Sequence, residues 1–374
     1  MIIGLSILFA SYFIAIMILV YGYKKVAVFP PARPGISKKF SLIIPYRNEA
    51  ENLPELLNSI AKLKYPKDLL EILFVNDASE DHSEAIIIAA SEKIPFSIHC
   101  ISNKRISNSP KKDAILEAIK NANHEWIITT DADCKLPQDW LKSLDAFIQH
   151  KNPVMVCGPV IYGGNNSFVE DFQQLDALSL QAVAIGSFGV GNPILSNGAN
   201  FAYTKDAFFK VNGFVGNDHL ASGDDVFLLE KMRAKFPGQV QFLKSAQAIV
   251  STNPQKNWKN VINQRIRWAS KVSKQNNFAS MLLGVQVFLV NLILLILPFL
   301  LIFNFENWMV YTLLIIFKLA TDFVFIWLSA RFFDVKIQLW KFLLHTYIYA
   351  AISVIVVLGS FRGEYSWKGR SFNT

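Results

Sequence analysis

Residues 126–133, WIITTDAD, place two aspartates directly behind a short apolar segment. Two earlier stretches have the same form: residues 40–50 read FSLIIPYRNEA and residues 70–81 read LEILFVNDASED. Apolar runs of this length, each followed by polar residues, are typical of buried strands. Helical patterns lie between them, and strands that alternate with helices predict a parallel sheet with right-handed crossovers. The sequence therefore predicts an α/β domain whose ligand binds at the carboxyl ends of the strands.

The α/β region extends over about 250 residues, which is enough for one large domain with a full core. Its expected strands are residues 40–45, 70–76, 96–101 and 126–130, and its expected helices are residues 49–63, 83–93 and 111–120. No Gly-x-Gly-x-x-Gly follows the first strand and no Gly-x4-Gly-Lys-Ser/Thr occurs, which argues against a dinucleotide fold and a phosphate loop. The glycine-rich residues 186–191, GSFGVG, lie between a helical stretch and a loop, and we interpret them as a flexible connection.

The composition indicates a membrane protein. Hydrophobic residues make up 52% of the chain and the mean hydropathy is +0.29, above the usual range of soluble domains. The excess lies in four apolar segments, residues 2–20, 281–303, 308–330 and 342–361. Each is long enough to cross a hydrocarbon core of about 30 Å. The first could be a cleaved signal peptide, but no Lys or Arg precedes it and no small-residue cleavage site follows it, which favours an anchor.

The positive-inside rule places the soluble region in the cytoplasm of an inner-membrane, multi-pass protein, because Lys24 and Lys25 follow the first segment. Three further crossings would export the basic tail, residues 362–374, against the same rule. Either one segment lies in the interface or the tail is exported. The segment 308–330 is favoured as the interfacial one because it carries two charged residues, Lys318 and Asp322. These residues are four positions apart, so they could instead neutralise each other within a helix bundle.

The charge distribution argues against nucleic acid as a partner. Residues 251–374 contain 13 Lys/Arg and 4 Asp/Glu, whereas residues 1–250 contain 24 Lys/Arg and 25 Asp/Glu, so the soluble part has no basic excess. Within the basic part, residues 255–275 form a helical pattern with apolar and cationic faces, which suits an anionic membrane surface. The chain is thus divided into an anchor (1–23), a soluble domain (24–254), an interfacial helix (255–275), a membrane region of two or three spans (276–361) and a basic tail (362–374).

The order of the motifs resembles that of the family 2 glycosyltransferases, the inverting, membrane-associated group that includes cellulose and hyaluronan synthases and ceramide glucosyltransferase. The resemblance covers about residues 40–268. It is carried by IIPYRNEAENL, FVNDASED, PKKDAILEAI, Asp131-Ala132-Asp133, SNGANFAY, Ala221-Ser222-Gly223-Asp224-Asp225 and the Gln-x-x-Arg-Trp of residues 264–268. It implies a GT-A type nucleotide-sugar-binding domain with a mostly parallel sheet, and an inverting hexosyltransferase activity.

The resemblance also implies site residues. Asp225 takes the place of the catalytic base and Asp224 replaces the acidic residue before it; Asp131 and Asp133 stand where the family binds divalent metal, Mg²⁺ or Mn²⁺. Asp77 stands at the uracil-recognising position, where Asn76 replaces a first acidic residue. The remaining substrate-binding positions are Pro45, Tyr46, Glu49, Lys112, Gly198, Gln264, Arg267 and Trp268.

These residue types suit a single displacement at the anomeric carbon. A carboxylate such as Asp225 deprotonates the acceptor hydroxyl, and a metal with Lys112 and Arg267 neutralises the leaving diphosphate. Each has a structural alternative: Asp131 and Asp133 as a solvated acidic turn, Asp224 and Asp225 as a charge pair at a helix amino terminus, and Trp268 as an interfacial anchor.

The favoured function is transfer of one sugar from a nucleoside diphosphate sugar, UDP-linked by preference, to a lipid or saccharide acceptor at the membrane. A processive polysaccharide synthase is the nearest alternative, although three apolar segments are few for a translocation channel. A non-catalytic nucleotide-binding membrane subunit is the alternative from another class.

Overall fold

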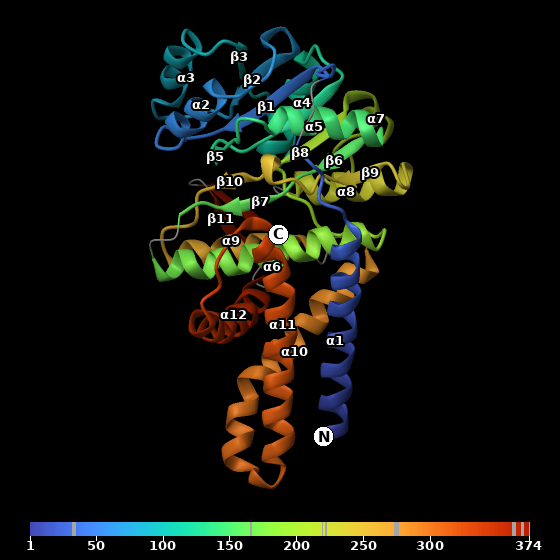
Figure 1. Cartoon of the computed structure of the whole chain (residues 1–374). Helices are drawn as coiled ribbons and strands as arrows, with labels where there is room; N and C mark the ends of the chain where they lie inside the picture. The colour runs from blue at the N-terminus through green and yellow to red at the C-terminus, as the bar shows by residue number, and fades with distance from the viewer. Residues whose placement is uncertain are drawn as a thin grey trace.

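The computed structural model describes residues 1–31, 35–164, 167–218, 220, 223–272, 277–360, 364–367 and 370–373. Ala221 and Ser222 of the predicted acidic motif, and part of the basic tail, lie outside these ranges. An α/β domain stands above a group of long helices, and two further helices run across the chain between the two parts (Figure 1). The predicted combination of a mostly parallel sheet and long apolar helices is confirmed.

A seven-stranded sheet in the order β3-β2-β1-β4-β8-β6-β9 forms the centre of the domain. Its strands are β1 (Phe40–Tyr46), β2 (Leu70–Asn76), β3 (Ser97–Ser102), β4 (Trp126–Thr129), β6 (Met155–Cys157), β8 (Phe201–Thr204) and β9 (Val240–Phe242). The first four strands pair in parallel, as the apolar runs predict, whereas β8 pairs antiparallel with both β4 and β6. Tyr46 pairs with Asn76 and Asn76 pairs with Ser102, so β1, β2 and β3 end at one edge.

Both faces of the sheet are covered, which explains why its strands read as continuous apolar runs. Phe40, Leu42 and Ile44 point to one core, with residues of α2 and α5, whereas Ile43 points to the other, with residues of α4 and α6. The surrounding helices and short strands are α2 (Leu53–Ala61), η1 (Lys67–Leu69), α3 (Ser83–Ser91), α4 (Pro110–Asn121), β5 (Cys134–Lys135), α5 (Trp140–Lys151), β7 (Val160–Tyr162), α7 (Lys205–Lys210), α8 (Asp224–Lys235), η2 (Ala246–Ala248) and β10 (Val250–Thr252). Strands β5, β10 and β7 form a second small sheet.

Four helices are long and apolar enough to cross a membrane. They are α1 (Ile2–Lys25), α10 (Phe278–Phe303), α11 (Trp308–Phe333), which follows the short turn η3 (Phe305–Asn307), and α12 (Leu339–Ser360). Between them and the sheet lie α6 (Phe168–Gly189) and the predicted amphipathic helix, α9 (Trp258–Val272), and a hairpin of β11 (Glu364–Trp367) and β12 (Arg370–Asn373) contacts α9 (Figure 1).

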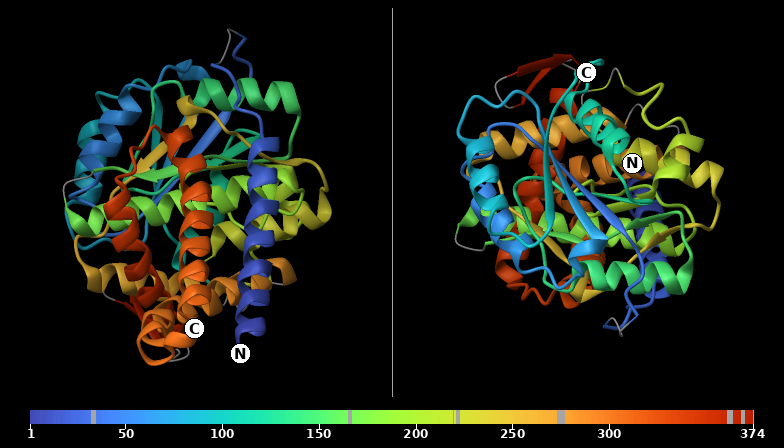
Figure 2. Two further views of the ribbon diagram at one scale, coloured as in Figure 1. Left: turned by 60° about the horizontal axis from the view of Figure 1, so that its bottom comes forward. Right: turned by 90° about the horizontal axis from the view of Figure 1, so that it is seen from above.

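The long helices do not all run in the same direction. Helix α11 runs beside α10 and extends away from the α/β domain in the same direction as α1 (Figures 1 and 2). Its two charges are accommodated because Lys318 forms an ion pair with Asp322, as the spacing predicted, and Tyr12 of α1 donates a hydrogen bond of 2.7 Å to Asp322 Oδ1. Instead, α12 lies across the other helices and packs on α6 and α9 through Phe172, Val261 and Ile352.

The glycine-rich residues 186–191 are not a flexible connection. Gly186 and Gly189 belong to the last turn of α6 and pack against Gly22 of α1. A Cβ on Gly22 would lie 2.1 Å from the Gly186 carbonyl oxygen, and one on Gly189 would lie 1.8 Å from the Gly22 carbonyl oxygen. Only glycine lets these two backbones approach so closely, and the contact ties the anchor helix to α6.

Candidate active site

One cavity of about 1120 Å³ runs from the carboxyl edge of the sheet to the long helices. Every predicted site residue except Lys112 lines it: Pro45, Tyr46, Glu49, Asp77, Asp131, Asp133, Gly198, Asp224, Asp225, Gln264, Arg267 and Trp268. These residues come from six separate stretches of the chain. The fold therefore brings nearly all of the sequence candidates to one place.

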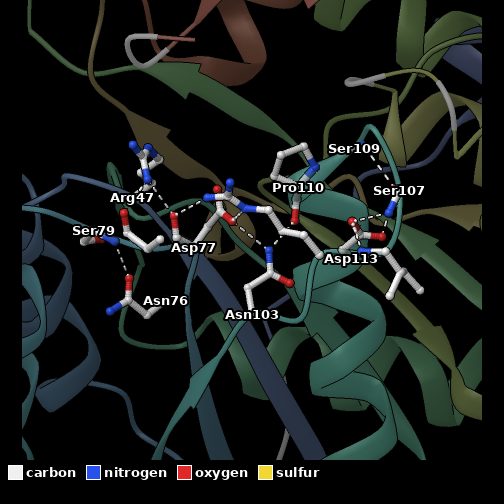
Figure 3. Close-up of polar contacts among 12 residues, drawn as sticks. Arg47, Asn76, Asp77, Ser79, Asn103, Ser107, Ser109, Pro110 and Asp113 are labelled. Carbon is white, nitrogen blue, oxygen red and sulfur yellow. Dashed lines mark hydrogen bonds and ion pairs between the residues drawn. The ribbon is translucent and has the colours of Figure 1, made fainter.

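Asp77 lies at the edge where β1, β2 and β3 end. Its side chain is buried, and its Oδ1 atom accepts hydrogen bonds from Asn103 Nδ2 at 2.8 Å and Arg105 Nε at 2.7 Å (Figure 3). Asn103 also donates to the Pro110 carbonyl oxygen at 3.0 Å, which links the end of β3 to the start of α4. These contacts fix the orientation of the carboxylate before any ligand binds.

The loops beside Asp77 are held by further side chains. Arg47 Nη1 donates to the Asp77 carbonyl oxygen at 2.9 Å and Nη2 pairs with Glu80 at 2.9 Å, which joins the loops after β1 and β2. On the other side, Asp113 accepts hydrogen bonds from the backbone N–H groups of Ile106 and Ser107 at 3.1 and 2.9 Å (Figure 3). The loops at this edge of the sheet are therefore connected by side-chain hydrogen bonds and an ion pair.

The lysine that faces the cavity is Lys111, not Lys112. Lys111 Nζ lies 2.7 Å from Asp131 Oδ1 and 3.2 Å from Asp224 Oδ2, and so bridges two acidic segments. Burial lowers the pKa of Lys111, but the carboxylates of Asp131 and Asp224 outweigh it and raise the pKa well above its usual range. Lys112 points into the protein, where its Nζ donates to the carbonyl oxygens of Asn217 and Leu220 at 2.6 and 2.9 Å. The helical pattern alone did not show which of two adjacent lysines turns outward.

Asp131 and Asp133 follow β4 and both line the cavity. Among the described residues, no three His, Cys, Asp or Glu side chains form a complete metal site. The pair nevertheless fits Mg²⁺ or Mn²⁺, because such ions are often held by one or two carboxylates and take their other ligands from phosphates and water. The Lys111 contact shows that a cation is already favoured beside Asp131.

Asp225 lies in the first turn of α8, where the chain enters the helix through Gly223 at a φ of 83°. Its Oδ2 atom accepts the Gly198 N–H at 3.3 Å and its Oδ1 atom accepts the Val226 N–H at 2.8 Å. A Cβ on Gly198 would lie 2.9 Å from Asp224 Oδ2, so a larger residue would displace this carboxylate. Asp225 therefore lies both at a helix amino terminus and in the cavity.

The Gln-x-x-Arg-Trp segment lies on α9 and closes the cavity on the side of the long helices. Gln264 accepts a hydrogen bond from Tyr162 at 3.2 Å. Arg265, which sequence reasoning did not select, forms a buried ion pair with Asp176 of α6, and its guanidinium lies 4.2 Å from the Trp268 ring centroid. This pair fixes the indole against α6.

Sequence reasoning therefore missed Asn103, Arg105, Lys111, Asp176 and Arg265. A signal existed for the first two, because residues at the end of a third parallel strand lie beside those that follow the second. Asp176 carried no such signal, since its partner lies 89 positions further along the chain.

Comparisons with known proteins show similar sequences and a similar fold. Residues 41–211 match the family described as Glycosyl transferase family 2. The chain is similar to the poly(ribitol-phosphate) β-N-acetylglucosaminyltransferase TarS of Staphylococcus aureus, with 32% identity over 32% of this chain and 20% of that protein. It is also similar to the probable glycosyltransferase YdaM of Bacillus subtilis, with 26% identity over 62% of this chain and 54% of that protein.

A third relative is the undecaprenyl-phosphate 4-deoxy-4-formamido-L-arabinose transferase of Photorhabdus laumondii, with 36% identity over 29% of this chain and 33% of that protein. The chain thus spans between a fifth and about half of the length of these curated relatives. Among solved structures, a mannosyltransferase from Pyrobaculum calidifontis in complex with GDP-Man and Mn²⁺ has a similar fold, with a TM-score of 0.58 and 15% identity over 97% of this chain and 98% of that one. The chain adopts the GT-A fold, and its residues 41–211 are similar to the domain of glycosyl transferase family 2.

Proposed function

We propose that this protein transfers a sugar, with inversion, from a nucleoside diphosphate sugar to a hydroxyl of a lipid-linked or membrane-proximal acceptor. The observation that carries the proposal is the single cavity, which joins the acidic residues at the sheet edge to α9 and the long helices. A donor bound at the sheet edge and an acceptor bound beside α9 and the long helices would meet beside Asp225.

The donor is proposed to bind at the sheet edge. Asp77, oriented by Asn103 and Arg105, would accept a hydrogen bond from the N–H of a base, and the uracil of a UDP-sugar supplies such a donor. Lys111 and Arg267 both line the cavity and would neutralise the diphosphate. Lys111 replaces Lys112 in this role.

A divalent metal would be held by Asp131 and Asp133. When bound, it would neutralise charge that develops on the departing diphosphate. Because the metal would take over the Asp131 carboxylate, the Lys111 ammonium could then turn toward the phosphate oxygens. Asp133, two positions after Asp131, completes the pair of oxygen donors.

Asp225 is proposed as the general base. As the acceptor oxygen forms its bond to the anomeric carbon, the bond from that carbon to the diphosphate oxygen breaks, and the acceptor proton passes to Asp225. The Gly198 and Val226 N–H groups hold the carboxylate in place during this step. Trp268, braced by Arg265, would offer an apolar face to the sugar or acceptor, and Gln264 a hydrogen bond.

The same proposal places the active site at the membrane surface. If α1, α10 and α11 cross the bilayer while α12 lies at the interface with α6 and α9, the amino terminus is outside, and both the α/β domain and the basic tail are cytoplasmic. This arrangement satisfies the positive-inside rule, which four crossings would not. In a variant whose Cys100, Cys134 and Cys157 are replaced by serine, a single cysteine is inserted directly after Met1 or introduced at residue 370. An impermeant maleimide should modify the first from outside and the second only after lysis.

The proposed reaction can be tested with purified full-length protein in phospholipid nanodiscs. We expect release of nucleoside diphosphate, and radiolabel in the organic phase, from at least one of UDP-glucose, UDP-galactose, UDP-N-acetylglucosamine and GDP-mannose when total membrane lipid is supplied. No turnover of any nucleotide sugar would contradict the proposal. Product size distinguishes the two modes of transfer, since a polymer would indicate a processive synthase and one added sugar a single transfer.

A further inference from the structure

Helix α9 presents Gln264 and Trp268 to the cavity, and two kinds of contact hold the helix in place. Its apolar face packs on α6 and α12, where Val261 lies in a buried cluster with Phe172 and Ile352. Burial of apolar area fixes the position of a helix, but it is non-directional and does not orient polar side chains. The second kind of contact is polar, and it involves the side chains that face the cavity.

Three side chains supply these polar contacts. The Tyr162 hydroxyl of β7 donates a hydrogen bond of 3.2 Å to Gln264 Oε1. Arg265 forms its ion pair with Asp176 of α6, and its guanidinium carbon lies 4.2 Å from the Trp268 ring centroid. All five side chains line the cavity. The two residues that the proposed reaction assigns to the acceptor are thus held by contacts that start from β7 and α6.

The Asp176–Arg265 pair is buried, and burial makes it costly. The two residues are 6% and 9% exposed, and the Arg265 Nε and Nη1 atoms have no hydrogen-bond partner among the residues that the structure describes. Burial raises the pKa of the Asp176 carboxyl, and the Arg265 guanidinium offsets this rise only in part. Apolar residues of similar size can often replace such a pair without loss of stability. Stability alone therefore does not explain why two charges are placed here.

The pair supplies orientation instead. A guanidinium is planar and rigid, so a carboxylate that holds it also fixes the face that it presents to an aromatic ring. An apolar side chain would fill the same space beside Trp268 without fixing the plane of the ring. In the same way, the bond from Tyr162 engages the carbonyl end of the Gln264 amide and turns the NH₂ end away from Tyr162.

We propose that Tyr162, Asp176 and Arg265 are positioning residues of the acceptor site. Tyr162 sets the direction of the Gln264 amide, and the Asp176–Arg265 pair sets the plane of the Trp268 ring. An acceptor then meets side chains that are already oriented, which reduces the entropy lost on binding. This inference rests on the proposed function and adds to it the residues that orient the acceptor-binding side chains.

The orientation of the indole can be measured without any substrate. Full-length protein in detergent micelles would be labelled with 5-fluorotryptophan, and Trp268→Phe would identify the Trp268 fluorine resonance among those of the eight tryptophans. We expect one narrow Trp268 resonance in the parent protein. In the double variant Asp176→Leu, Arg265→Met, the resonance should broaden or split because the ring adopts several orientations, while the melting temperature stays the same or rises. A single narrow resonance in this variant would overturn the role of the pair.

Two further variants make this measurement specific. Arg265→Lys keeps both charges but loses the planar group, so it should also broaden the Trp268 resonance, and it replaces the double variant if that protein does not fold. The matched control is Asp171→Leu, Lys341→Met, which removes another ion pair between α6 and a neighbouring helix, with a separation of 2.6 Å and outside the cavity lining. The control should leave the Trp268 resonance narrow. Equal broadening in the control would show a general loosening of α6 and would overturn the assignment.

Kinetics then test what the orientation is for. With total membrane lipid as the acceptor, the double variant should raise the lipid concentration needed for half-maximal rate by about 10-fold. Tyr162→Phe should raise it by about 5-fold, the effect of one lost hydrogen bond. UDP affinity, measured by calorimetric titration, should stay unchanged in both, because the residues at the sheet edge are intact. An unchanged lipid dependence, or an equal loss of UDP affinity, would contradict a role at the acceptor.

Failure of the inference differs from failure of the proposed function. If the Trp268 resonance responds to the double variant and not to the control, but no nucleotide sugar is turned over, the transferase is wrong and the positioning contacts remain. If transfer occurs but neither the resonance nor the lipid dependence responds, the positioning role is wrong and the transferase remains.

Discussion

The two halves of the cavity are built differently. At the sheet edge the polar groups already hold one another: Asp77 is bound by Asn103 and Arg105, and Lys111 bridges Asp131 and Asp224. Between the long helices, the Asn291 Oδ1 atom and both His345 ring nitrogens are buried without hydrogen-bond partners among the residues that the structure describes. The polar groups of the first half are thus held in place before a ligand binds, whereas the second half leaves buried polar atoms without partners.

This difference has a physical reason. A nucleotide sugar is polar and charged at fixed positions, so the groups that recognise it gain from being oriented in advance. A lipid is mostly apolar, and a few polar atoms are enough to set its depth. Changes at the sheet edge should therefore act on catalysis and donor binding, and changes between the helices on the acceptor.

The largest effect is expected where the two halves meet. Asp225→Asn removes the proposed base while it keeps the size of the side chain, so kcat should fall by about 10²- to 10⁴-fold. Donor affinity, measured by calorimetric titration with UDP, should change little. Asp206→Asn on α7, an exposed position away from the cavity, is the matched control. An Asp225→Asn enzyme with normal turnover would assign the base to another residue.

Metal removal is expected to have the next largest effect. Loss of charge neutralisation at the diphosphate is worth several kcal/mol, so chelation should slow transfer by about 100-fold or more, and Mg²⁺ or Mn²⁺ should restore it. Asp131→Asn and Asp133→Asn should raise the metal concentration needed for half-maximal rate. Full activity in excess chelator would show that the reaction does not require a metal.

The two adjacent lysines provide a sharper comparison. Lys111→Met leaves Asp131 and Asp224 without their shared cation, and should reduce kcat/KM for the donor by about 10- to 100-fold, since contacts between charged groups contribute about 1.5–3 kcal/mol each. Lys112→Met should instead lower the melting temperature more than it raises the donor KM, because its ammonium supports the Asn217 and Leu220 carbonyls. A large loss of donor kcat/KM in Lys112→Met, with only a lowered melting temperature in Lys111→Met, would instead identify Lys112 as the phosphate ligand.

The smallest effect is expected at Glu71 of β2, in the sheet that supports the donor site. Burial raises the pKa of Glu71, but hydrogen bonds from Ser41 and Asn123 outweigh it and lower the pKa below the usual 4.5. This contribution to stability is present above about pH 4.5 and is lost as the pH falls through the lowered value. Glu71→Gln should therefore cost about 1 kcal/mol at pH 7 and less in acid. Melting curves of both proteins from pH 7 to pH 4 measure the difference, and a constant gap at all pH values would argue against it.

The sheet edge could be predicted from sequence because each of its elements is local. The apolar runs 40–45 and 70–76 define their strands, and the residues that follow a parallel strand must lie at its carboxyl end. The orientation of a side chain is less local, so the sequence does not show that Lys111, rather than Lys112, faces the cavity. Arg265 could not be assigned either, because its partner Asp176 comes from another helix.

The membrane region shows the same limit more strongly. Hydropathy located all four apolar helices within a few residues, because length and composition suffice for that. It could not show that α12 lies across α10 and α11, nor that Gly186 and Gly189 pack against Gly22, since both depend on contacts between segments far apart in the chain. Lys318 and Asp322 were paired correctly because they are neighbours on one helix.

A cryo-EM structure with UDP and Mn²⁺ would show whether dispersed segments of the chain form one site for a nucleotide sugar and a cation. We expect the uracil beside Asp77, the diphosphate near Lys111, and Mn²⁺ between the phosphates and the Asp131 and Asp133 carboxylates, with Asp225 facing the space left for the sugar. UDP bound elsewhere on the protein, or Mn²⁺ remote from both aspartates, would contradict it.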